Sequence, residues 1–294
     1  MSFSQLVKKA QEYLPPEKLA IIKNAYDYAR KAHEGQFRKS GEPYLEHPLQ
    51  VALTLAELQL DTSSLAAALL HDVSENCGIP ISEIEAKFGP EIAKLVDGTT
   101  KLGKLSLETP GEVTQRAGKT TSEEQAENLR KMLVAMAEDL RVVFIKLADR
   151  LHNMQTLDAL APEKQRSIAW ETAEVYAPLA HRLGIWELKW QLEDLAFRYL
   201  EPEHYDNVVK LLADRHIQRE SAFDQVIQVL NREFEQAGLV TEVSGRPKHL
   251  YSIHQKMEKY ATMGKDFNDI NDLLAIRVLV NSVPDCYTAL GIIH

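Results

Sequence analysis

The sequence predicts a mainly α-helical protein that changes to a smaller mixed α/β domain in its last third. Through the first two hundred residues, apolar side chains recur at helical spacing, as in "EKLAIIKNAYDYARKAHE" at 17–34. After Gly238 the pattern changes to the short β-branched segments "LVTEVSG" and "LLAIRVLV", with the helical pattern "RPKHLYSIHQKMEKY" between them. We therefore expect a helical domain over 1–198 and the first part of an α/β domain over 199–294.

The composition narrows the class of protein. The 294-residue chain has a formal net charge of −9, which argues against a dominating nucleic-acid face, so we expect no direct DNA binding. Its two cysteines, Cys77 and Cys286, form no CxxC pattern, which is typical of a reducing compartment. The apolar runs are too short to cross a bilayer. We therefore expect a cytoplasmic protein with no membrane contact.

Capping and stop signals set the expected helix boundaries. Asp61 predicts the start of a helix over 62–77, which Gly78 and Pro80 would end. Another helix is expected from about 81 to 96, ending near Gly98. The remaining helical patterns cover 17–34, 47–59 and most of the chain from 122 to about 237.

Residues 103–122 differ from the helices around them. They are polar and rich in Gly, Thr and Ser, with no sustained apolar period. Long loops in compact domains are usually mobile or functional. We therefore expect a loop here that serves as a lid or signalling element.

Polar residues at the end of an apolar helix give the first chemical signal. In "ALLHDVSENC", His71 and Glu75 are four residues apart, and Asp72 lies three residues from Glu75 and four from Asn76. Residues at these offsets share a helical face. A charged face on a buried helix is unfavourable unless something pairs with it, and imidazole with carboxylates is a normal ligand set for a divalent metal.

Two further segments offer groups of the same kind. In "LRVVFIKLADRLHNMQTL", Asp149, Asn153 and Thr156 follow one another at i, i+4 and i+7 of an expected helix. In "RKSGEPYLEHPLQVA", His47 precedes Pro48 at an expected helix start, with two basic residues a few positions earlier. These segments could complete one site.

Each signal also has an ordinary explanation. Taken alone, His47 is more often a turn histidine, and His71 with Asp72 is more often a plain pair at a helix end. Asp149 could form an ion pair with Arg150, and the basic residues before Gly41 could be a solvated loop. Only the combination of the sets favours a metal site.

Taken together, the motifs resemble those of the HD-type phosphohydrolase superfamily, in which a His precedes a His-Asp pair and a distant Asp. More specifically, the chain resembles the N-terminal catalytic half of the RelA/SpoT homologues, the Rel-type bifunctional (p)ppGpp synthetases/hydrolases. The resemblance covers nearly the whole chain. It rests on "RKSGEPYLEHP", "AALLHDVSEN", "LVDGTTKL", "AENLRKMLVAMAEDLRVVFIKLADRLHNM", "YAPLAHRLGIWELKWQLEDLAF", "GRPKHLYSIHQKM" and "DLLAIRVLV".

The resemblance implies an all-helical HD-type hydrolase domain followed by a truncated synthetase domain of mixed α/β, nucleotidyltransferase-like fold. The first domain would use Mn²⁺ to hydrolyse the 3′-diphosphate of ppGpp or pppGpp, giving GDP or GTP and pyrophosphate. The implied site residues are the metal ligands His47, His71, Asp72 and Asp149, the substrate-binding residues Arg38, Lys39, Ser40, Asn153 and Thr156, and Glu75 and Asn76 for the attacking water.

The chain departs from the family pattern at Asn76, where the family has Asp after the Glu that corresponds to Glu75. An amide can orient a water molecule but cannot accept its proton at neutral pH. We therefore expect a hydrolase of reduced or differently tuned activity. Two alternatives stay open: a catalytically weak HD domain that senses nucleotide and regulates the synthetase, and a hydrolase for another nucleotide, such as a dNTP or NADPH.

For the second domain, the resemblance implies transfer of pyrophosphate from ATP to the 3′-hydroxyl of GDP or GTP. The implied residues are Arg246, Lys248, Ser252, Lys256 and Arg277 for the nucleotide and Asp272 for Mg²⁺. Without the resemblance, the "RPKHLYSIHQK" segment would be a basic surface helix. The family's second acidic ligand and guanine-stacking tyrosine fall beyond residue 294. We therefore expect this chain not to synthesise the nucleotide, and any ribosome association to belong to C-terminal regions beyond it.

Overall fold

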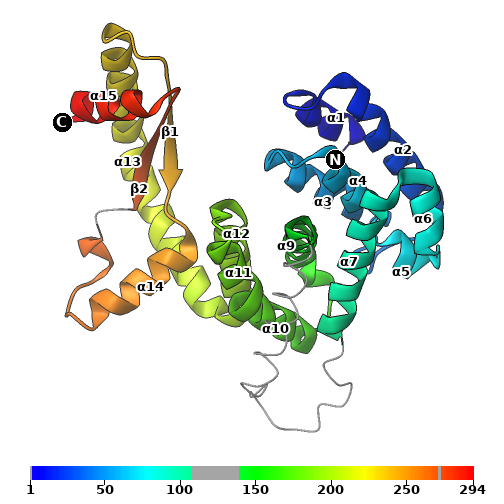
Figure 1. Cartoon of the computed structure of the whole chain (residues 1–294). Helices are drawn as coiled ribbons and strands as arrows, with labels where there is room; N and C mark the ends of the chain where they lie inside the picture. Colours follow the sequence, from blue (N-terminus) through cyan, green and yellow to red (C-terminus); the bar gives the residue numbers. More distant parts are fainter. Residues whose placement is uncertain (1, 108–138, 271–272) are drawn as a thin grey trace. The chain divides into compact units, whose positions relative to one another are not determined.

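The computed structural model describes residues 2–107, 139–270 and 273–294 (Figure 1). The chain divides into two compact units, Met1–Ala196 and Phe197–His294. The described residues are mainly helical, with one two-stranded sheet in the second unit, so the expected fold class is confirmed. Within these ranges we find no helix whose length and hydropathy would let it cross a membrane.

The first unit consists of packed helices (Figure 1). They are α1 (Phe3–Gln11), α2 (Pro16–Ala32), α3 (Glu46–Glu57), α4 (Thr62–Leu70), α5 (Val73–Cys77), α6 (Ile81–Phe88), α7 (Pro90–Leu107), α9 (Leu140–Gln155), α10 (Pro162–Glu171), α11 (Ala177–Arg182) and most of α12 (Trp186–Leu200). A 3₁₀ turn, Leu157–Ala159, follows α9, and a π-helical turn, Thr172–Tyr176, joins α10 to α11.

Helix α4 forms the centre of the first unit. Leu65, Leu69 and Leu70 are fully buried, and the helix contacts α2, α3, α7 and α9. A helix that is apolar on every side is stable only when other elements cover it. Asp61 caps its start as predicted, because the Asp61 side chain accepts a hydrogen bond from the backbone N–H of Ser64.

The helix expected over 62–77 is two helices. The chain leaves helical geometry at Asp72, which has φ −94° and ψ −8° in the sparsely populated bridge region. Nδ1 of His71 lies 2.8 Å from the carbonyl oxygen of Ala68, so the His71 side chain forms a hydrogen bond with a backbone carbonyl near the end of α4. Side-chain bonds of this kind compete with continuation of a helix. The break moves His71 and Asp72 off a regular helical face.

The helix expected over 81–96 is also divided. Gly89 adopts φ +88°, a left-handed conformation that glycine accepts readily, and it separates α6 from α7. Pro90 then begins α7, where its missing N–H needs no partner. The sequence Phe-Gly-Pro at 88–90 is itself typical of one helix ending and another beginning.

The predicted helix end near Gly98 is wrong, because α7 continues to Leu107. A Cβ at Gly98 would lie 2.8 Å from a methyl carbon of Val142, so this glycine permits close packing of α7 against α9. The expected loop at 103–122 is therefore wrong over 103–107. Its remaining residues, 108–122, lie outside the described residues, as does the expected helix from 122 to 138.

The second unit combines helices with an antiparallel pair of strands. Its elements are the end of α12, α13 (Pro202–Gln236), β1 (Thr241–Pro247), α14 (Leu250–Ala261), a 3₁₀ turn (Phe267–Asp269), β2 (Leu274–Val280) and α15 (Val283–Ile293). In the sheet, Ser244 pairs with Arg277. A buried cluster joins the end of α12 to α13, α14 and the segment before β2, and consists of Phe197, Val208, Ile253, Phe267, Ile270 and Leu273.

The first strand lies two residues later than expected. The segment Arg246–Pro247 ends β1 and does not form the turn that was expected to enter the helix. Helix α14 begins only at Leu250. β-branched composition locates a strand, but its ends depend on pairing, and here β1 pairs along its whole length with β2.

Candidate metal centre

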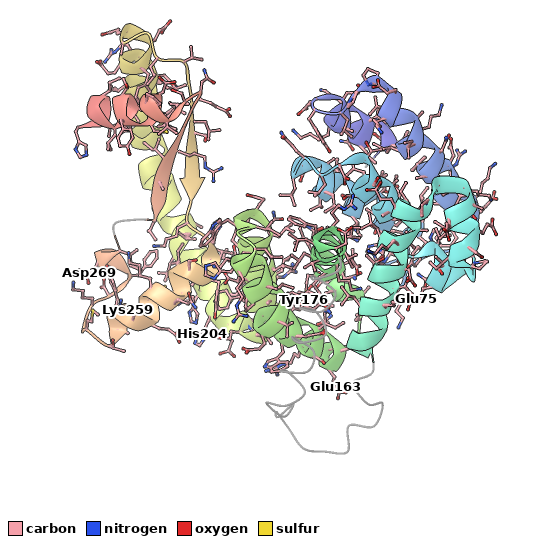
Figure 2. The ribbon with its side chains drawn as sticks, viewed as in Figure 1. Glu75, Glu163, Tyr176, His204, Lys259 and Asp269 are labelled. Atoms are coloured by element: carbon pink, nitrogen blue, oxygen red, sulfur yellow. The ribbon has the colours of Figure 1, made fainter. Side chains whose placement is uncertain are left out.

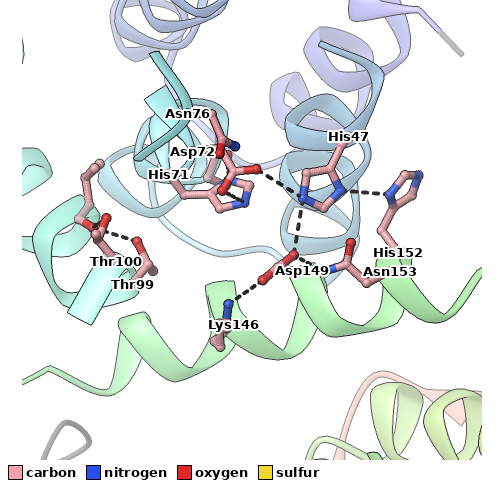
Figure 3. A network of polar contacts seen from close by, with 12 residues as sticks. His47, His71, Asp72, Asn76, Thr99, Thr100, Lys146, Asp149, His152 and Asn153 are labelled. Carbon is pink, nitrogen blue, oxygen red and sulfur yellow. Dashed lines mark hydrogen bonds and ion pairs between the residues drawn. The ribbon is translucent and has the colours of Figure 1, made fainter. Parts of the chain in front are cut away.

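Four expected ligands come from three parts of the first unit (Figure 3). His47 lies in the first turn of α3, His71 and Asp72 lie at the break between α4 and α5, and Asp149 lies in the middle of α9. Contacts of α3 with both α4 and α9 bring these parts together. The break after Leu70 therefore contributes directly to the site.

The ligand atoms of these residues converge. Nε2 of His47 is 3.2 Å from Oδ1 of Asp149 and 3.6 Å from Oδ2 of Asp72. Nε2 of His71 is 3.3 Å from Oδ1 of Asp72. His47, His71 and Asp149 are buried, and each offers an atom within 4.8 Å of the others. This donor set of two imidazoles and two carboxylates fits one divalent cation.

Hydrogen bonds fix the tautomer of His47. Arg38 is always a donor, so its Nη1, 3.0 Å from Nδ1 of His152, makes that nitrogen an acceptor. Nδ1 of His47 lies 2.8 Å from the same nitrogen and must carry the proton between them. Burial lowers the pKa of His47, so the ring is neutral at pH 7 and its Nε2 lone pair faces Asp149.

His71 is oriented in the same way. Its Nδ1 faces the carbonyl oxygen of Ala68 and must donate to it, which leaves Nε2 facing Asp72 as the atom available to a ligand. This buried Nε2 has no hydrogen-bond partner among the described residues. A lone pair directed at a carboxylate in a buried space is repulsive unless a cation lies between them. The residues therefore fit a metal ion.

Asp149 and Asp72 both carry the negative charge that a metal ligand needs. Burial favours protonation of Asp149, but the Lys146 ammonium outweighs it and holds the pKa of Asp149 well below its ordinary value. For Asp72, burial is likewise outweighed, in part by the hydrogen bond from the Tyr44 hydroxyl, and its pKa is also lowered. Both groups are therefore ionised at neutral pH, as metal ligation requires.

Three residues of this network were missed by the sequence analysis. Nζ of Lys146 donates to Oδ2 of Asp149 at 2.7 Å, the Tyr44 hydroxyl donates to Oδ2 of Asp72 at 2.7 Å, and His152 contacts His47. Lys146 and His152 each lie three positions from Asp149 on α9, the offset at which helical neighbours meet, whereas Tyr44 lies in the turn before α3. Such outer partners orient ligands and fix their protonation.

A short turn carries Arg38 to the site. Phe37 and Pro43 form an isolated antiparallel bridge, and Gly41 adopts φ +86° between them. Nη2 of Arg38 donates to Oδ1 of Asn153 at 2.6 Å. Lys39 and Ser40 lie exposed in the same turn. The structure thus brings Arg38 to α9 and leaves its two neighbours in solvent.

The remaining hydrolase residues lie around the ligands in different ways. Asn153 donates to Oδ1 of Asp149 at 2.6 Å, whereas the Thr156 hydroxyl donates to the carbonyl of His152 on its own helix. Glu75 is exposed on α5 (Figure 2). Nδ2 of Asn76 donates to the Tyr44 hydroxyl at 2.6 Å, which places Asn76 at the end of a hydrogen-bonded chain to Asp72.

The ordinary explanation of Asp149 does not hold. Arg150 pairs instead with Glu171, at 2.8 Å, and its guanidinium lies 4.0 Å from the centre of the Tyr176 ring. Asp149 is therefore not paired with Arg150. Lys146, on the same helix, contacts its carboxylate, which faces the ligand cluster.

The expected nucleotide residues of the second unit lie around α14 and β2. Lys248 precedes α14, Ser252 and Lys256 lie four residues apart on it, and Arg277 is exposed on β2. The backbone of Arg246 pairs with Ala275. Asp272 lies outside the described residues.

Comparison with known protein families identifies the class. Residues 25–186 match the family model described as "HD domain", and residues 245–294 match the "Region found in RelA / SpoT proteins". The first match covers more than half of the chain, so the chain belongs to the HD domain family.

Curated relatives confirm the resemblance to RelA/SpoT homologues. A GTP pyrophosphokinase from Myxococcus xanthus is 47% identical over 96% of this chain and 36% of its own length. A probable guanosine-3′,5′-bis(diphosphate) 3′-pyrophosphohydrolase from Synechocystis is 48% identical over 93% and 34%. The bifunctional (p)ppGpp synthase/hydrolase SpoT from Escherichia coli is 44% identical over 99% and 40%. The chain therefore spans 34–40% of the length of these relatives.

Proposed function

We propose that the HD domain of this chain is a Mn²⁺-dependent hydrolase of the 3′-diphosphate of ppGpp or pppGpp, releasing pyrophosphate with GDP or GTP. The observation that carries the proposal is the pair of buried imidazoles, His47 and His71, whose Nε2 atoms face Asp149 and Asp72. The names of the relatives supply the substrate class. Two imidazole ligands favour Mn²⁺ over Mg²⁺, which prefers oxygen ligands and several waters.

The reaction needs stabilisation of the phosphate charge and a proton acceptor for water. A bound divalent cation supplies polarisation of the phosphoryl group and a lower pKa for its water. Arg38 would release Asn153 and His152 and bind phosphate oxygens, for which its planar guanidinium is suited. Lys39 and Ser40, exposed beside it, would bind the same polyanion. Asn153 and Thr156 would contact the nucleoside.

Glu75 would accept the proton of the attacking water. Its neighbour Asn76 cannot do so, and its amide is bonded to Tyr44. We therefore propose a turnover lower than an acidic pair at these positions would give. This hydrogen bond also favours the second candidate function, a domain that binds the nucleotide without hydrolysing it and regulates the synthetase.

The proposal is tested by following pyrophosphate release from ppGpp with and without Mn²⁺ in the chain and in Asp149→Ala. Asp27→Ala, which removes an exposed carboxylate paired only loosely with Arg30 at 3.2 Å, is the matched control. The expected result is Mn²⁺-dependent turnover in the chain and in Asp27→Ala, and its loss in Asp149→Ala. Tight ppGpp binding without turnover would favour the sensing domain. Faster turnover of a dNTP or NADPH would contradict the substrate class.

We also propose that functional domains divide near residue 198 and that the second takes part in Mg²⁺-dependent pyrophosphate transfer from ATP to GDP or GTP. The match over 245–294 supports this assignment. The residues proposed for the nucleotide are Arg246, Lys248, Ser252, Lys256 and Arg277, with Asp272 for Mg²⁺.

A further inference from the structure

A second group of metal-binding side chains lies in the second unit, where α13 begins. Glu201 directly precedes α13, His204 lies in its first turn (Figure 2), and His254 lies in α14. Oε2 of Glu201 is 2.8 Å from Nδ1 of His204 and 3.2 Å from Nε2 of His254. One atom from each of the three residues lies within 4.8 Å of the others. None of them belongs to the hydrolase site.

The core of the second unit holds His254 in place. Its ring is stacked on Phe197 with centroids 4.7 Å apart, and its other neighbour is the His204 ring at 5.0 Å. Only 8% of the His254 side chain is exposed, compared with 62% for His204. Because Phe197 is part of the buried cluster, the ring plane of His254 is fixed and its Nε2 points to Glu201.

We propose that Glu201, His204 and His254 bind a Zn²⁺ ion that links the start of α13 to α14. Zinc bonds of about 2.0–2.1 Å in tetrahedral geometry separate ligand atoms by about 3.3 Å. The two nitrogen–oxygen distances, 2.8 and 3.2 Å, are therefore within about 0.5 Å of what the ion requires. Small rotations of the two exposed side chains are enough to admit it.

The chemistry of the cluster selects the ion. In the absence of metal, two imidazoles share one carboxylate oxygen, so a single negative group faces two donors. A zinc ion would take the place of both shared protons, each ring then carrying its single proton on its other nitrogen, and would bind all three groups directly. Two histidines with one glutamate form a known zinc donor set, whereas Mg²⁺ and Ca²⁺ prefer oxygen. Glu258, with Oε1 3.7 Å from Nε2 of His254, or water would take the fourth position.

The site lies on the other side of α14 from the proposed nucleotide residues. Ser252 and Lys256 are each two positions from His254, which corresponds to about 200° around a helix. Zinc at His254 would therefore bind the face of α14 opposite Ser252 and Lys256. It would stabilise this helix without competing with a nucleotide for ligands. The expected consequence is a more rigid attachment of α14 to α13.

Zinc stoichiometry tests the site, and the hydrolase ligands must be removed first because they would also bind zinc. The background is the chain carrying His71→Ala and Asp149→Ala, freed of metal by a chelator and dialysed against Zn²⁺. The expected result is one bound equivalent in this background, none after His204→Ala is added, and one after the control His294→Ala. His204 is exposed, so its loss does not disturb the core, and circular dichroism checks the fold.

A second readout reports the coordination geometry. Co²⁺ in place of zinc is expected to give the strong visible absorption of a four-coordinate site in the background chain, and His254→Gln is expected to abolish it. No bound zinc at micromolar concentration would overturn the proposal and leave a hydrogen-bonded cluster only. Zinc bound equally after His204→Ala would overturn it as well.

Discussion

At the scale of single residues, the ligand cluster is controlled by the group behind each ligand. His152 accepts a hydrogen bond from His47, the Ala68 carbonyl accepts one from His71, and Lys146 holds Asp149 ionised. Burial, together with His47 and Arg38, lowers the pKa of His152 to about 3, so His152 stays an acceptor throughout the neutral range. His47 and the two carboxylates are thus held in the protonation states that metal binding needs.

Replacing Asn76 with Asp tests the cause of the expected low turnover. The new carboxylate can accept a proton from water, whereas the amide bonds only to Tyr44. A general base contributes roughly 10²–10⁴-fold, of which Glu75 already supplies a part, so Asn76→Asp is expected to raise kcat by about tenfold or more. The measurement is steady-state ppGpp hydrolysis with saturating Mn²⁺. An unchanged kcat in a folded variant would show that position 76 does not limit the reaction.

Removing Arg38 tests how phosphate is held. Charge-assisted bonds contribute about 1.5–3 kcal/mol, so Arg38→Ala is expected to raise the KM for ppGpp by roughly 10- to 100-fold. Lys39→Ala removes an exposed neighbour and is expected to have a smaller effect. Mn²⁺ affinity, measured by calorimetry, should change little in both. An unchanged KM for ppGpp in Arg38→Ala would show that Arg38 does not bind phosphate and only holds Asn153 in place.

The sequence alone selected the candidate ligands that the structure brings together, but not the residues that support them. His71, Asp72 and Asp149 could be selected because charged groups stood out in apolar helices. Tyr44 and His152 could not, because an aromatic ring or a further histidine on a helix is more often ordinary packing. Their contribution depends on hydrogen bonds between residues up to 114 positions apart, which spacing within one helix does not reveal.

At the scale of elements, one arginine joins the starts of three helices. Arg141 contacts Asp61 at 2.7 Å, Glu91 at 2.6 Å and Asp139 at 2.8 Å, which lie at the beginnings of α4, α7 and α9. Only 27% of the Arg141 side chain is exposed. These helices carry or flank the candidate ligands, so this network holds the helices around the candidate metal site.

Arg141→Met is therefore expected to lower the free energy of unfolding by about 1–3 kcal/mol at pH 7. The control Arg30→Met breaks an exposed pair and should cost less than about 1 kcal/mol. Bonds from Arg141 lower the pKa of Asp139, so this stabilisation is present above the ordinary carboxyl pKa and is lost as pH falls through the lowered value. Denaturant unfolding should show the difference from the parent chain narrowing below about pH 4. A difference that does not change with pH would contradict this origin.

Gly98→Ala tests the contact between α7 and α9. The added methyl would lie 2.8 Å from Val142, whose β-branched side chain has few alternatives, so the helices must separate. We expect a loss of about 1–3 kcal/mol. Gly291→Ala is the matched control, because a Cβ there meets nothing within 4 Å, and it should be neutral or stabilising. Thermal unfolding of both variants measures the effect. Equal thermal unfolding midpoints for the two variants would contradict the close contact between Gly98 and Val142.

Apolar periodicity located most helices but not their interruptions. It could not by itself distinguish Gly98, which lies inside α7, from Gly89, which ends α6; Pro90 marks the second case in the sequence, but the contact of Gly98 with Val142 is seen only in the structure. The break at Asp72 was equally hidden, since its cause is a side-chain bond from His71 to Ala68. Boundaries of this kind depend on tertiary contacts, which local propensity does not contain.

At the scale of the whole molecule, the chain combines two compact units with separate chemistry. The first contains the match to the HD domain family, and the second contains the match to the region found in RelA/SpoT proteins. Each has its own buried core and its own cluster of histidines with carboxylates. Metal binding at one cluster therefore has to be separated experimentally from metal binding at the other. The cytoplasmic location expected from the sequence remains a prediction.

A Mn²⁺ titration of ppGpp hydrolysis tests the central claim most directly. The chelator-treated chain is supplied with increasing Mn²⁺ while pyrophosphate release is followed, beside His71→Ala and His204→Ala. The account predicts saturation with a single class of site, loss of turnover in His71→Ala, and full turnover in His204→Ala. Turnover that survives the chelator, or that persists in His71→Ala, would contradict it.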